Sequence, residues 1–536
     1  MKNTHKIIKD VLEKQSLDRG EIPLSCLPDP SLIPNLELAA KRIIENLDNG
    51  KTMLIVGDYD CDGIMATTTM IDFFRHTKYR DMVDYIVPDR FIDGYGISKN
   101  MIDYAIQRGH DFIVTVDNGI GAFEAVEYAN EHNIEVIITD HHTPGEKIPN
   151  ANIIVNLKYE LGDFPFMEIS GATLAWYLCA QINKDISANI DMKKWLDLIG
   201  ITVISDVMPL KSLNTSLVRY ALNAIKDKKR FLYELIFSFN KREVLTETDI
   251  AFAFVPMINA VGRLDNARNA IEILLSKDKS FVRNGYRYLI DTNNQRKNLT
   301  QELLNKVTPE ADKQVESGCR AIVVRVEDLH EGIVGILAGK LAETYMRPCY
   351  VFGWNKEKNI WKGSGRTSGV IQLYDLTREA SEYALGFGGH AGAVGVAILD
   401  ENFDNWKNII QEKAKLIQEK EFIPVGEVPF EVNLSDINQE LMSIIDSYRP
   451  YGQEFPMPVF KVEVFVSILE SYKEGLHTKC IVIDQEGFSY VAWFFHDKNL
   501  SIHNGKTVNI LFTPVKSITN KGYVIELHAT VNYLNR

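Results

Sequence analysis

Three short apolar segments in the first 142 residues each run into a group of acidic or histidine side chains. The segments are residues 52–56, 112–116 and 136–139. The side chains that follow them are Asp58, Asp60, Asp62, Asp117, Asp140, His141 and His142. Carboxylates this dense repel one another unless a cation lies among them, and oxygen with imidazole donors suits Mn²⁺ or Mg²⁺. The residue types therefore predict a metal centre.

The elements that must position these groups are predicted to be parallel β-strands. The three apolar segments alternate with helical patterns at residues 98–108 and 122–132, which is typical of βαβ units. In such sheets ligands bind outside the carboxyl ends of the strands. We therefore expect the acidic and histidine side chains at one edge of one sheet. A further apolar segment, residues 199–207, carries Asp206 and closes this region.

Each group taken alone has a simpler interpretation. The pattern at residues 58–63 is also that of a calcium loop, but an EF-hand would need a glutamate where Thr69 stands. Asp117 alone would be a turn residue, and residues 140–142 alone could cap a helix. Because three separate strand ends each carry acidic or histidine residues, a metal site is favoured over these simpler interpretations. Two divalent ions about 3.5–4 Å apart bind the attacking and leaving oxygens of a phosphoryl displacement, and Asp117 is the candidate bridging ligand.

Composition excludes some classes of protein. The 536 residues are 45% hydrophobic and 24% charged, and no apolar stretch approaches the length of a membrane span. The six cysteines are scattered without a Cys-x-x-Cys pair, which argues against a zinc knuckle or a disulfide framework. A cytoplasmic location is expected. The net charge of −13 disfavours nucleic acid only weakly, because divalent cations would add local positive charge.

The chain is expected to have five parts. Residues 1–50 are a helical segment, 51–210 the first α/β domain, 211–318 a helical region with a connecting helix at 278–307, 319–423 a second α/β domain, and 424–536 a small antiparallel β-barrel.

Several motifs in this order resemble the DHH phosphoesterase superfamily. They are Asp58-Tyr-Asp60-Cys-Asp62-Gly63, Val116-Asp117-Asn118-Gly119, Asp140-His141-His142 and Ser205-Asp206-Val207. The residues 365–368 and 388–392 resemble the DHHA1 domain that accompanies it. The motif at 259–264 and the barrel-like end narrow the resemblance to the RecJ family of single-strand-specific 5′→3′ exonucleases. Cys61 and Val261 stand where that family usually has alanine.

The resemblance implies roles for the acidic and histidine residues. One ion would be bound by Asp58, Asp60 and Asp117. The other would be bound by Asp62, Asp117, His141 and Asp206. His142 would lie beside the scissile phosphate as a catalytic contact. Asp140, the other catalytic residue, would hold the ring of a metal-binding histidine.

Substrate contacts are expected in two places. Arg366 is placed in a Gly/Ser-rich loop with Ser364 and Ser368, which suits a phosphate contact. His390 is flanked by Gly388 and Gly389, which allow a close approach. The resemblance places Arg90 at the 5′-terminal phosphate and Arg263 at the backbone of the strand. In the barrel, Trp493, Phe494 and Phe495 are candidate stacking residues, of which at least one must be core.

The predicted function is hydrolysis of single-stranded DNA to 5′-mononucleotides, by two-metal in-line attack of water, in DNA repair or recombination. Alternatives are a DHH phosphodiesterase for short or cyclic nucleotides and a non-catalytic replication scaffold of the same superfamily. The resemblance implies a single-strand-binding protein and a helicase as partners, no membrane, and a monomer.

Overall fold

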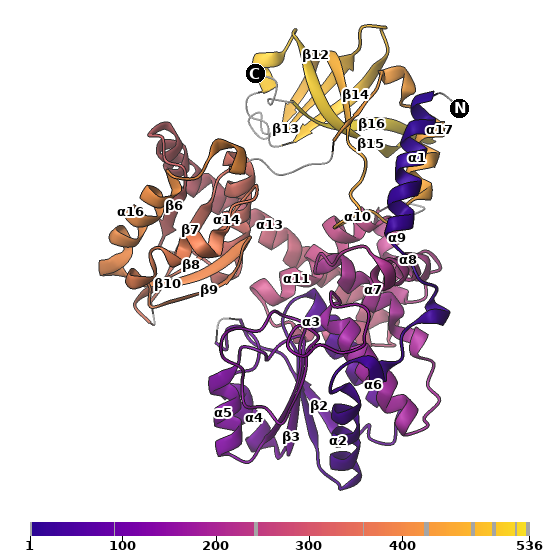
Figure 1. The fold of residues 1–536 in the computed structure, drawn as a ribbon, viewed down its shortest axis with the longest axis vertical. Coiled ribbons are helices and arrows are strands. Elements are labelled where there is room, and N and C mark those ends of the chain that lie inside the picture. The colour runs from indigo at the N-terminus through magenta and orange to yellow at the C-terminus, as the bar shows by residue number, and fades with distance from the viewer. Residues whose placement is uncertain are drawn as a thin grey trace. The chain divides into compact units, whose positions relative to one another are not determined.

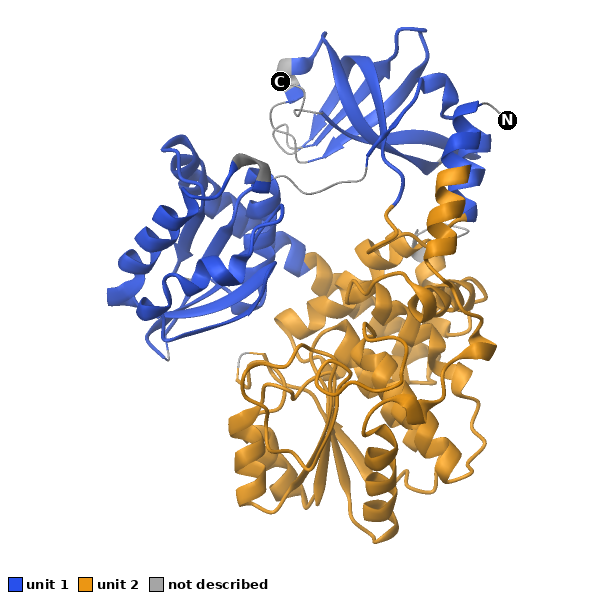
Figure 2. Cartoon of the chain, viewed as in Figure 1, with its two compact units in different colours: residues 1–9, 295–447, 457–536 blue, residues 10–294, 448–456 orange. Residues whose placement is uncertain are grey.

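The structure is a computed structural model. It describes residues 3–90, 92–240, 245–327, 329–356, 358–422, 428–472, 477–495, 500–519 and 522–531. The chain divides into two compact units (Figure 2). Unit 1 comprises residues 1–9, 295–447 and 457–536, and unit 2 comprises residues 10–294 and 448–456. Within the described ranges, no helix is both long enough and apolar enough to cross a membrane.

A parallel β-sheet with the strand order β2-β1-β3-β4-β5 lies at the centre of unit 2 (Figure 1). Its strands are β1 (Met53–Val56), β2 (Val83–Ile86), β3 (Phe112–Val116), β4 (Glu135–Thr139) and β5 (Ile153–Val155). Every residue of β1 and β3 is buried, as expected of a parallel sheet covered on both faces. The predicted parallel sheet is confirmed.

Helices cover both faces of this sheet. Helices α4 (Lys99–Arg108) and α5 (Phe123–Glu131) share one apolar core with the sheet. In a second group, helix α6 (Gly171–Asp185) contacts α2 (Leu36–Asp48) and α3 (Cys61–Phe74), and each of the three also contacts a strand of the sheet. The remaining helices of this unit are α7 (Leu196–Ser205), α8 (Ser212–Lys226), α9 (Phe231–Asn240), α10 (Glu247–Asp249), the π-helix η4 (Ile250–Phe254), α11 (Val255–Leu264) and α12 (Arg268–Leu275).

Two helices extend across the boundary of unit 2. Helix α1 (Asn3–Asp18) precedes the sheet, and α13 (Lys279–Glu316) leads from unit 2 into unit 1. Helix α13 covers the connecting helix predicted at 278–307 and continues for a further nine residues.

The apolar segment 199–207 is largely helical. Residues Leu196 to Val203 of α7 are all buried. A helix that is buried on every side has no polar face, so the apolar run here forms a helix and not a strand. Asp206 is the residue that follows the last turn of α7.

Unit 1 contains a mixed sheet with the order β6-β7-β8-β10-β9. Its elements are β6 (Ile322–Val326), α14 (Val334–Tyr345), β7 (Cys349–Asn355), β8 (Ile360–Arg366), α15 (Leu373–Arg378), β9 (Gly386–His390), β10 (Ala393–Leu399) and α16 (Phe403–Ala414). Strands β6 and β7 are parallel and the other pairs are antiparallel.

The placement of Arg366 in a loop was wrong, because residues 360–366 form strand β8. A Cβ atom at Gly363 would lie 2.3 Å from the Phe352 ring, and one at Gly365 would lie 2.7 Å from the Tyr350 ring. Both rings belong to the buried core of this sheet. The glycines therefore make room for aromatic side chains of the neighbouring strand, and they do not signal a loop.

A closed barrel follows in unit 1, as predicted, but the expectation that it is antiparallel throughout was wrong, because two of its strand pairs are parallel. Its strands run β11-β12-β13-β14-β16-β15, and β12 also pairs with β15. The elements are β11 (Phe430–Glu431), α17 (Gln439–Ser447), β12 (Phe460–Tyr472), β13 (His477–Ile483), β14 (Ser489–Phe495), β15 (Thr507–Thr519) and β16 (Gly522–Val531).

Candidate metal centre

The segment 58–62, which we call the metal loop, joins β1 to the first turn of α3. Asp60 is the N-cap of α3, and its Oδ1 accepts a hydrogen bond of 3.1 Å from the Gly63 N–H. A Cβ atom at Gly63 would lie 2.5 Å from Cβ of Asp58, so only glycine permits this tight connection. The loop thus supplies three carboxylates to the groups that could hold a metal ion.

Asp62 is held by the N-terminus of α6. Its two carboxylate oxygens accept hydrogen bonds from the backbone N–H groups of Gly171, at 2.7 Å, and of Ala172, at 2.9 Å. The positive end of a helix dipole stabilises a carboxylate there. A Cβ atom at Gly171 would lie 2.3 Å from Oδ1 of Asp117, so the start of α6 is also packed against the residue that follows β3.

Asp117 follows β3 in a left-handed conformation, with φ of 64°. Few residues other than glycine adopt this backbone conformation, and those that do are concentrated at functional sites. The next side chain, Asn118, donates to the carbonyl oxygens of Val56 and Val116, which ties the ends of β1 and β3 together. Asp117 is 1% exposed.

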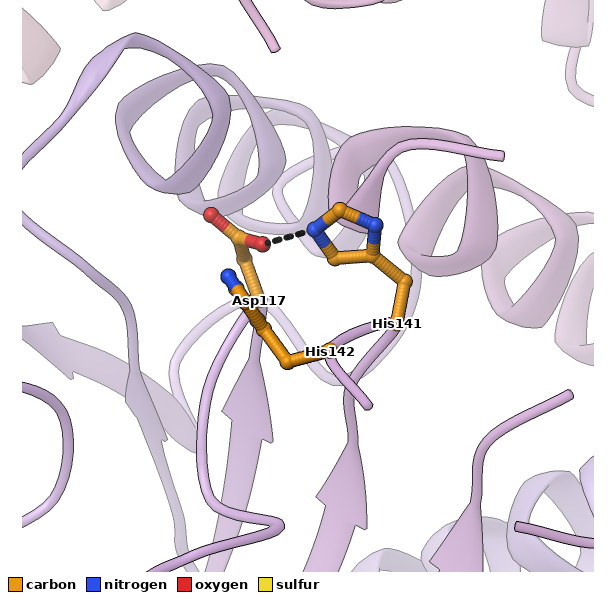
Figure 3. Close-up of side chains that lie close together, drawn as sticks. All are labelled: Asp117, His141 and His142. Atoms are coloured by element: carbon orange, nitrogen blue, oxygen red, sulfur yellow. Dashed lines mark ion pairs between the residues drawn. The ribbon is translucent and has the colours of Figure 1, made fainter. Parts of the chain in front are cut away.

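His141 lies close to carboxylates from three different elements, of which Figure 3 shows Asp117. Its Nε2 lies 3.1 Å from Oδ1 of Asp117, 3.4 Å from Oδ2 of Asp206 and 3.8 Å from Oδ2 of Asp62. Asp206 reaches this point from the end of α7.

Three groups in the described residues could each hold a metal ion, because their ligand atoms lie within 4.8 Å of one another. The groups are Asp58-Asp60-Asp117, Asp62-His141-Asp206 and Asp117-His141-His142. The first two groups match the two ligand sets that the family resemblance implied, except that the second group lacks Asp117, which was expected to bind both ions. The third offers His142 as a further donor.

Unpaired atoms support a cation at this place. Oδ1 of Asp58, Oδ1 of Asp117 and Nε2 of His141 are buried and make no hydrogen bond of normal geometry, although the last two atoms lie only 3.1 Å apart. Buried polar atoms are nearly always paired, so these donor atoms fit an ion of the Mn²⁺ or Mg²⁺ type. Cys61 belongs to none of the three groups.

Without a cation, the buried carboxylates of this site hold their protons more tightly than free carboxylates do. Burial, with repulsion from neighbouring carboxylates, raises the pKa of Asp62 to about 7 and of Asp206 to about 8. The pKa values of Asp58 and Asp117 are raised for the same reasons. Burial lowers the pKa of His141 to about 3, so its ring is neutral and able to bind a metal.

His142 has a different environment. Its Nδ1 lies 2.7 Å from Oδ1 of Asp140, whose Oδ2 accepts a hydrogen bond of 2.9 Å from the Ile120 N–H. Burial lowers the pKa of His142, but Asp140 outweighs it and the pKa rises to about 9. The hydroxyl of Tyr95 lies 3.2 Å from both ring nitrogens. Asp140 therefore orients the ring of His142, whereas we expected it to hold the ring of a metal-binding histidine.

Both arginines predicted in this part of the chain lie near the metal loop. The guanidinium of Arg90 is 4.9 Å from the ring centroid of Tyr59, the residue between Asp58 and Asp60. The charges of Arg90 and Arg263 both lower the pKa of Tyr59, which burial raises overall to about 12.

The other predicted substrate residues belong to unit 1. Arg366 and His390 pair with the same residue, Ala393, from either side, so their side chains share one face of the sheet. Ser364 and Gly388 pair with Gly395 in the next row of that face. Gly389 adopts a φ of 136° beside them, and the Ser368 hydroxyl lies 3.5 Å from the Phe422 carbonyl oxygen. That these residues contact the substrate stays a prediction.

Several contributors to the site were not selected from the sequence. They are the N–H groups of Gly171 and Ala172, the hydroxyl of Tyr95 and the side chain of Asn259, which accepts a hydrogen bond from Cys61. Backbone groups leave no signal in side-chain types. The Ser170-Gly171 pair before an apolar helix is a helix-start signal, but it does not reveal what the helix end binds.

Comparison with known protein families matches three domains in the order of the chain. The DHH family N-terminal domain matches residues 52–202, the DHHA1 domain matches 318–416, and the RecJ OB domain matches 428–529. The predicted order of domains agrees with these matches.

Curated relatives extend the match to most of the chain. The single-stranded-DNA-specific exonuclease RecJ of Bacillus subtilis is 32% identical over 81% of this chain and 55% of its own length. The Haemophilus influenzae protein of the same name is 30% identical over 85% of this chain and 82% of its own length. This chain thus spans little more than half of the Bacillus subtilis relative.

Solved structures share the fold. RecJ from Thermus thermophilus in complex with Mn²⁺ has a TM-score of 0.78 and 24% identity, covering 95% of this chain and 72% of that one. The same protein in complex with Mg²⁺ has a TM-score of 0.71. An exonuclease RecJ bound to manganese has a TM-score of 0.62 and 28% identity, covering 74% of this chain and 98% of that one.

Proposed function

Because this chain belongs to the RecJ family of single-stranded-DNA-specific exonucleases, we propose that it hydrolyses single-stranded DNA from the 5′ end to 5′-mononucleotides. The observation that carries the proposal is the cluster of buried carboxylate and imidazole atoms around His141, whose possible ligand atoms lie within 4.8 Å of one another in each group. Such a set supports a phosphoryl-transfer centre with two divalent cations, Mn²⁺ or Mg²⁺.

The metal-binding residues follow from the groups described above. Asp58 and Asp60 would hold one ion, Asp62, His141 and Asp206 the other, and Asp117 would be shared. Bound divalent ions lower the pKa of water and stabilise the charge that develops on the phosphate oxygens. Asp62 is preorganised for this role, because α6 fixes both of its oxygens.

His142 is the catalytic residue that we place beside the scissile phosphate. Its Nδ1 faces Asp140, and this carboxylate raises the pKa of the ring and so favours its protonated form. A protonated ring donates a hydrogen bond at Nε2, either to a phosphate oxygen or to the leaving oxygen. Asp140 acts as a positioning residue for that ring.

Arg90 and Arg263 provide a basis for the direction of digestion. Both contribute positive charge beside Tyr59 in the metal loop. A guanidinium binds a terminal phosphate through two hydrogen bonds. We assign Arg90 to the 5′-terminal phosphate and Arg263 to the backbone of the strand.

In unit 1, the sheet and the barrel each offer a surface for the strand. The row that contains Arg366 and His390 combines a guanidinium with an imidazole on one sheet face, which suits backbone phosphates. The part played by Ser364, Ser368, Gly388 and Gly389 is to allow the strand to approach closely.

The barrel carries an aromatic platform, formed by Tyr472, Trp493 and Phe495. The Trp493 and Phe495 rings are 6.0 Å apart with an interplanar angle of 5°, and the Tyr472 and Trp493 rings are 5.7 Å apart. The ammonium of Lys479 lies 5.3 Å from the Trp493 ring. Parallel rings beside a cation are what base stacking requires. Phe494 is fully buried, which confirms that one of the three neighbouring aromatics is core.

Two other functions share part of this evidence. A phosphodiesterase for short or cyclic nucleotides would use the same metal residues, but it would have no need for the barrel. A scaffold would lack hydrolysis altogether. We further propose a monomer that acts in DNA repair or recombination in the cytoplasm, with a single-strand-binding protein and a helicase as partners.

The test is digestion, with Mn²⁺, of a long single strand that is labelled at one end. We expect release of labelled mononucleotide from the 5′ end only, and none from Asp117→Ala. Asp81→Ala, a change at a side chain that is 85% exposed, is the matched control. Cleavage of dinucleotides without digestion of long strands would instead support the phosphodiesterase. Strand binding without any hydrolysis would support the scaffold.

A further inference from the structure

Helix α11 contacts the backbone of the metal loop at two points. At the first, Oδ1 of Asn259 accepts a hydrogen bond of 2.7 Å from the N–H of Cys61. Cys61 is the first residue of α3, so its N–H has no partner within the helix. The Asp60 side chain, which caps this helix, bonds to Gly63. Asn259 therefore satisfies a donor that the cap leaves open.

The second contact is made by Gly262, one turn further along α11. A Cβ atom there would lie 2.0 Å from the carbonyl oxygen of Tyr59. Real Cβ atoms do not approach an oxygen so closely, so only glycine allows the helix to pack at this distance. Residues three apart lie on the same face of a helix, so Asn259 and Gly262 form one surface against the loop.

These two contacts hold the peptide groups that alternate with the metal residues. Tyr59 lies between Asp58 and Asp60, and Cys61 lies between Asp60 and Asp62. A shift of either peptide group would move the carboxylates on both sides of it. Metal ligands must lie within about 0.2 Å of their ideal distances, so the loop has little freedom to move without loss of affinity.

We propose that Asn259 and Gly262 are positioning residues that set the affinity of the metal centre through the backbone of the metal loop. This inference rests on the proposed two-metal site. It assigns part of that site to helix α11, which contributes no metal ligand to the groups found in the described residues.

The test compares Asn259→Leu with Asn259→Asp. Leucine has a similar size but no acceptor, whereas aspartate keeps an oxygen at the same reach. Binding of Mn²⁺ is measured from the electron paramagnetic resonance signal of the free ion, without DNA. We expect the leucine variant to bind Mn²⁺ about 10–100-fold more weakly, as is typical when a residue that orients metal ligands is removed. The aspartate variant should retain the wild-type affinity or exceed it.

Gly262→Ala should weaken Mn²⁺ binding in the same way, because its methyl group would displace the Tyr59 carbonyl. Gly145→Ala is the matched control, since nothing lies within 4 Å of a Cβ atom there. Excess Mn²⁺ should restore turnover in Asn259→Leu, with an unchanged KM for DNA.

The outcomes separate this proposal from the proposed function. A lower melting temperature with wild-type Mn²⁺ affinity in both Asn259→Leu and Gly262→Ala would overturn the positioning role and leave the metal site intact. Absence of Mn²⁺ binding by the wild-type protein would instead overturn the metal site itself.

Discussion

Removal of divalent cations should make unit 2 progressively less stable as the pH rises from 6.5 to 8. Without a cation, the pKa is raised to about 7 for Asp62 and to about 8 for Asp206, by burial and by neighbouring carboxylates. In the unfolded chain both return to about 4. The folded state therefore holds protons that the unfolded state has released, and this stabilisation is lost as the pH passes through the folded pKa values.

The size of the effect follows from proton linkage. Each extra proton held by the folded state lowers stability by about 1.4 kcal/mol per pH unit. His142 acts in the same direction, because its pKa is raised to about 9, while the lowered pKa of His141 acts only below about pH 6.5. Each of these groups releases only part of its proton between pH 6.5 and 8. We therefore expect the free energy of unfolding of unit 2 to fall by about 2–4 kcal/mol over this pH range. In a unit of this size that corresponds to a fall in melting temperature of roughly 5 °C or more.

The assay is differential scanning calorimetry in EDTA and in Mn²⁺, with the transition that responds to Mn²⁺ assigned to unit 2. Mn²⁺ keeps the metal-binding carboxylates ionised in the folded state, so their part of the loss with pH should disappear when it is bound, and only the part due to His142 should remain. Asp206→Asn should reduce the slope in EDTA because it removes one of the titrating groups. Asp81→Asn, at an exposed side chain, should leave it unchanged.

One result would refute this reasoning. If the melting temperature in EDTA stays constant or rises between pH 6.5 and 8, the carboxylates are not held protonated at the centre. The close packing around His141 would then need another explanation.

Two further predictions concern residues that hold the site or the substrate. Gly171→Ala should weaken Mn²⁺ binding about 10-fold or more, because its methyl group would lie 2.3 Å from Oδ1 of Asp117. Isothermal titration calorimetry with Mn²⁺ measures this affinity. An unchanged affinity would contradict the prediction. Trp493→Ala should weaken binding of a long single strand by about 1–3 kcal/mol in fluorescence anisotropy, through loss of base stacking. Phe488→Ala, at an aromatic residue that is 49% exposed and outside the platform, is its control, and an equal loss in both variants would argue against a specific platform.

Local sequence was sufficient for the parallel sheet and for the acidic groups at its edge. Strands β1, β3 and β4 are buried at nearly all positions, so each appears as a largely apolar run. The residues that follow such a run must lie at the strand end. The positions of Asp58, Asp117 and Asp140 followed from that geometry alone.

Tertiary structure decided how the carboxylates are held. Asp206 comes from the end of a buried helix, Asp62 is fixed by the start of α6, and the metal loop is held by Asn259, which is almost 200 residues further along the chain. The glycines at 363 and 365 make room for aromatic rings on β7, so a local pattern that is typical of a loop forms a strand. Local propensities describe a residue and its near neighbours, whereas these contacts join distant segments and depend on the space that packing leaves between them.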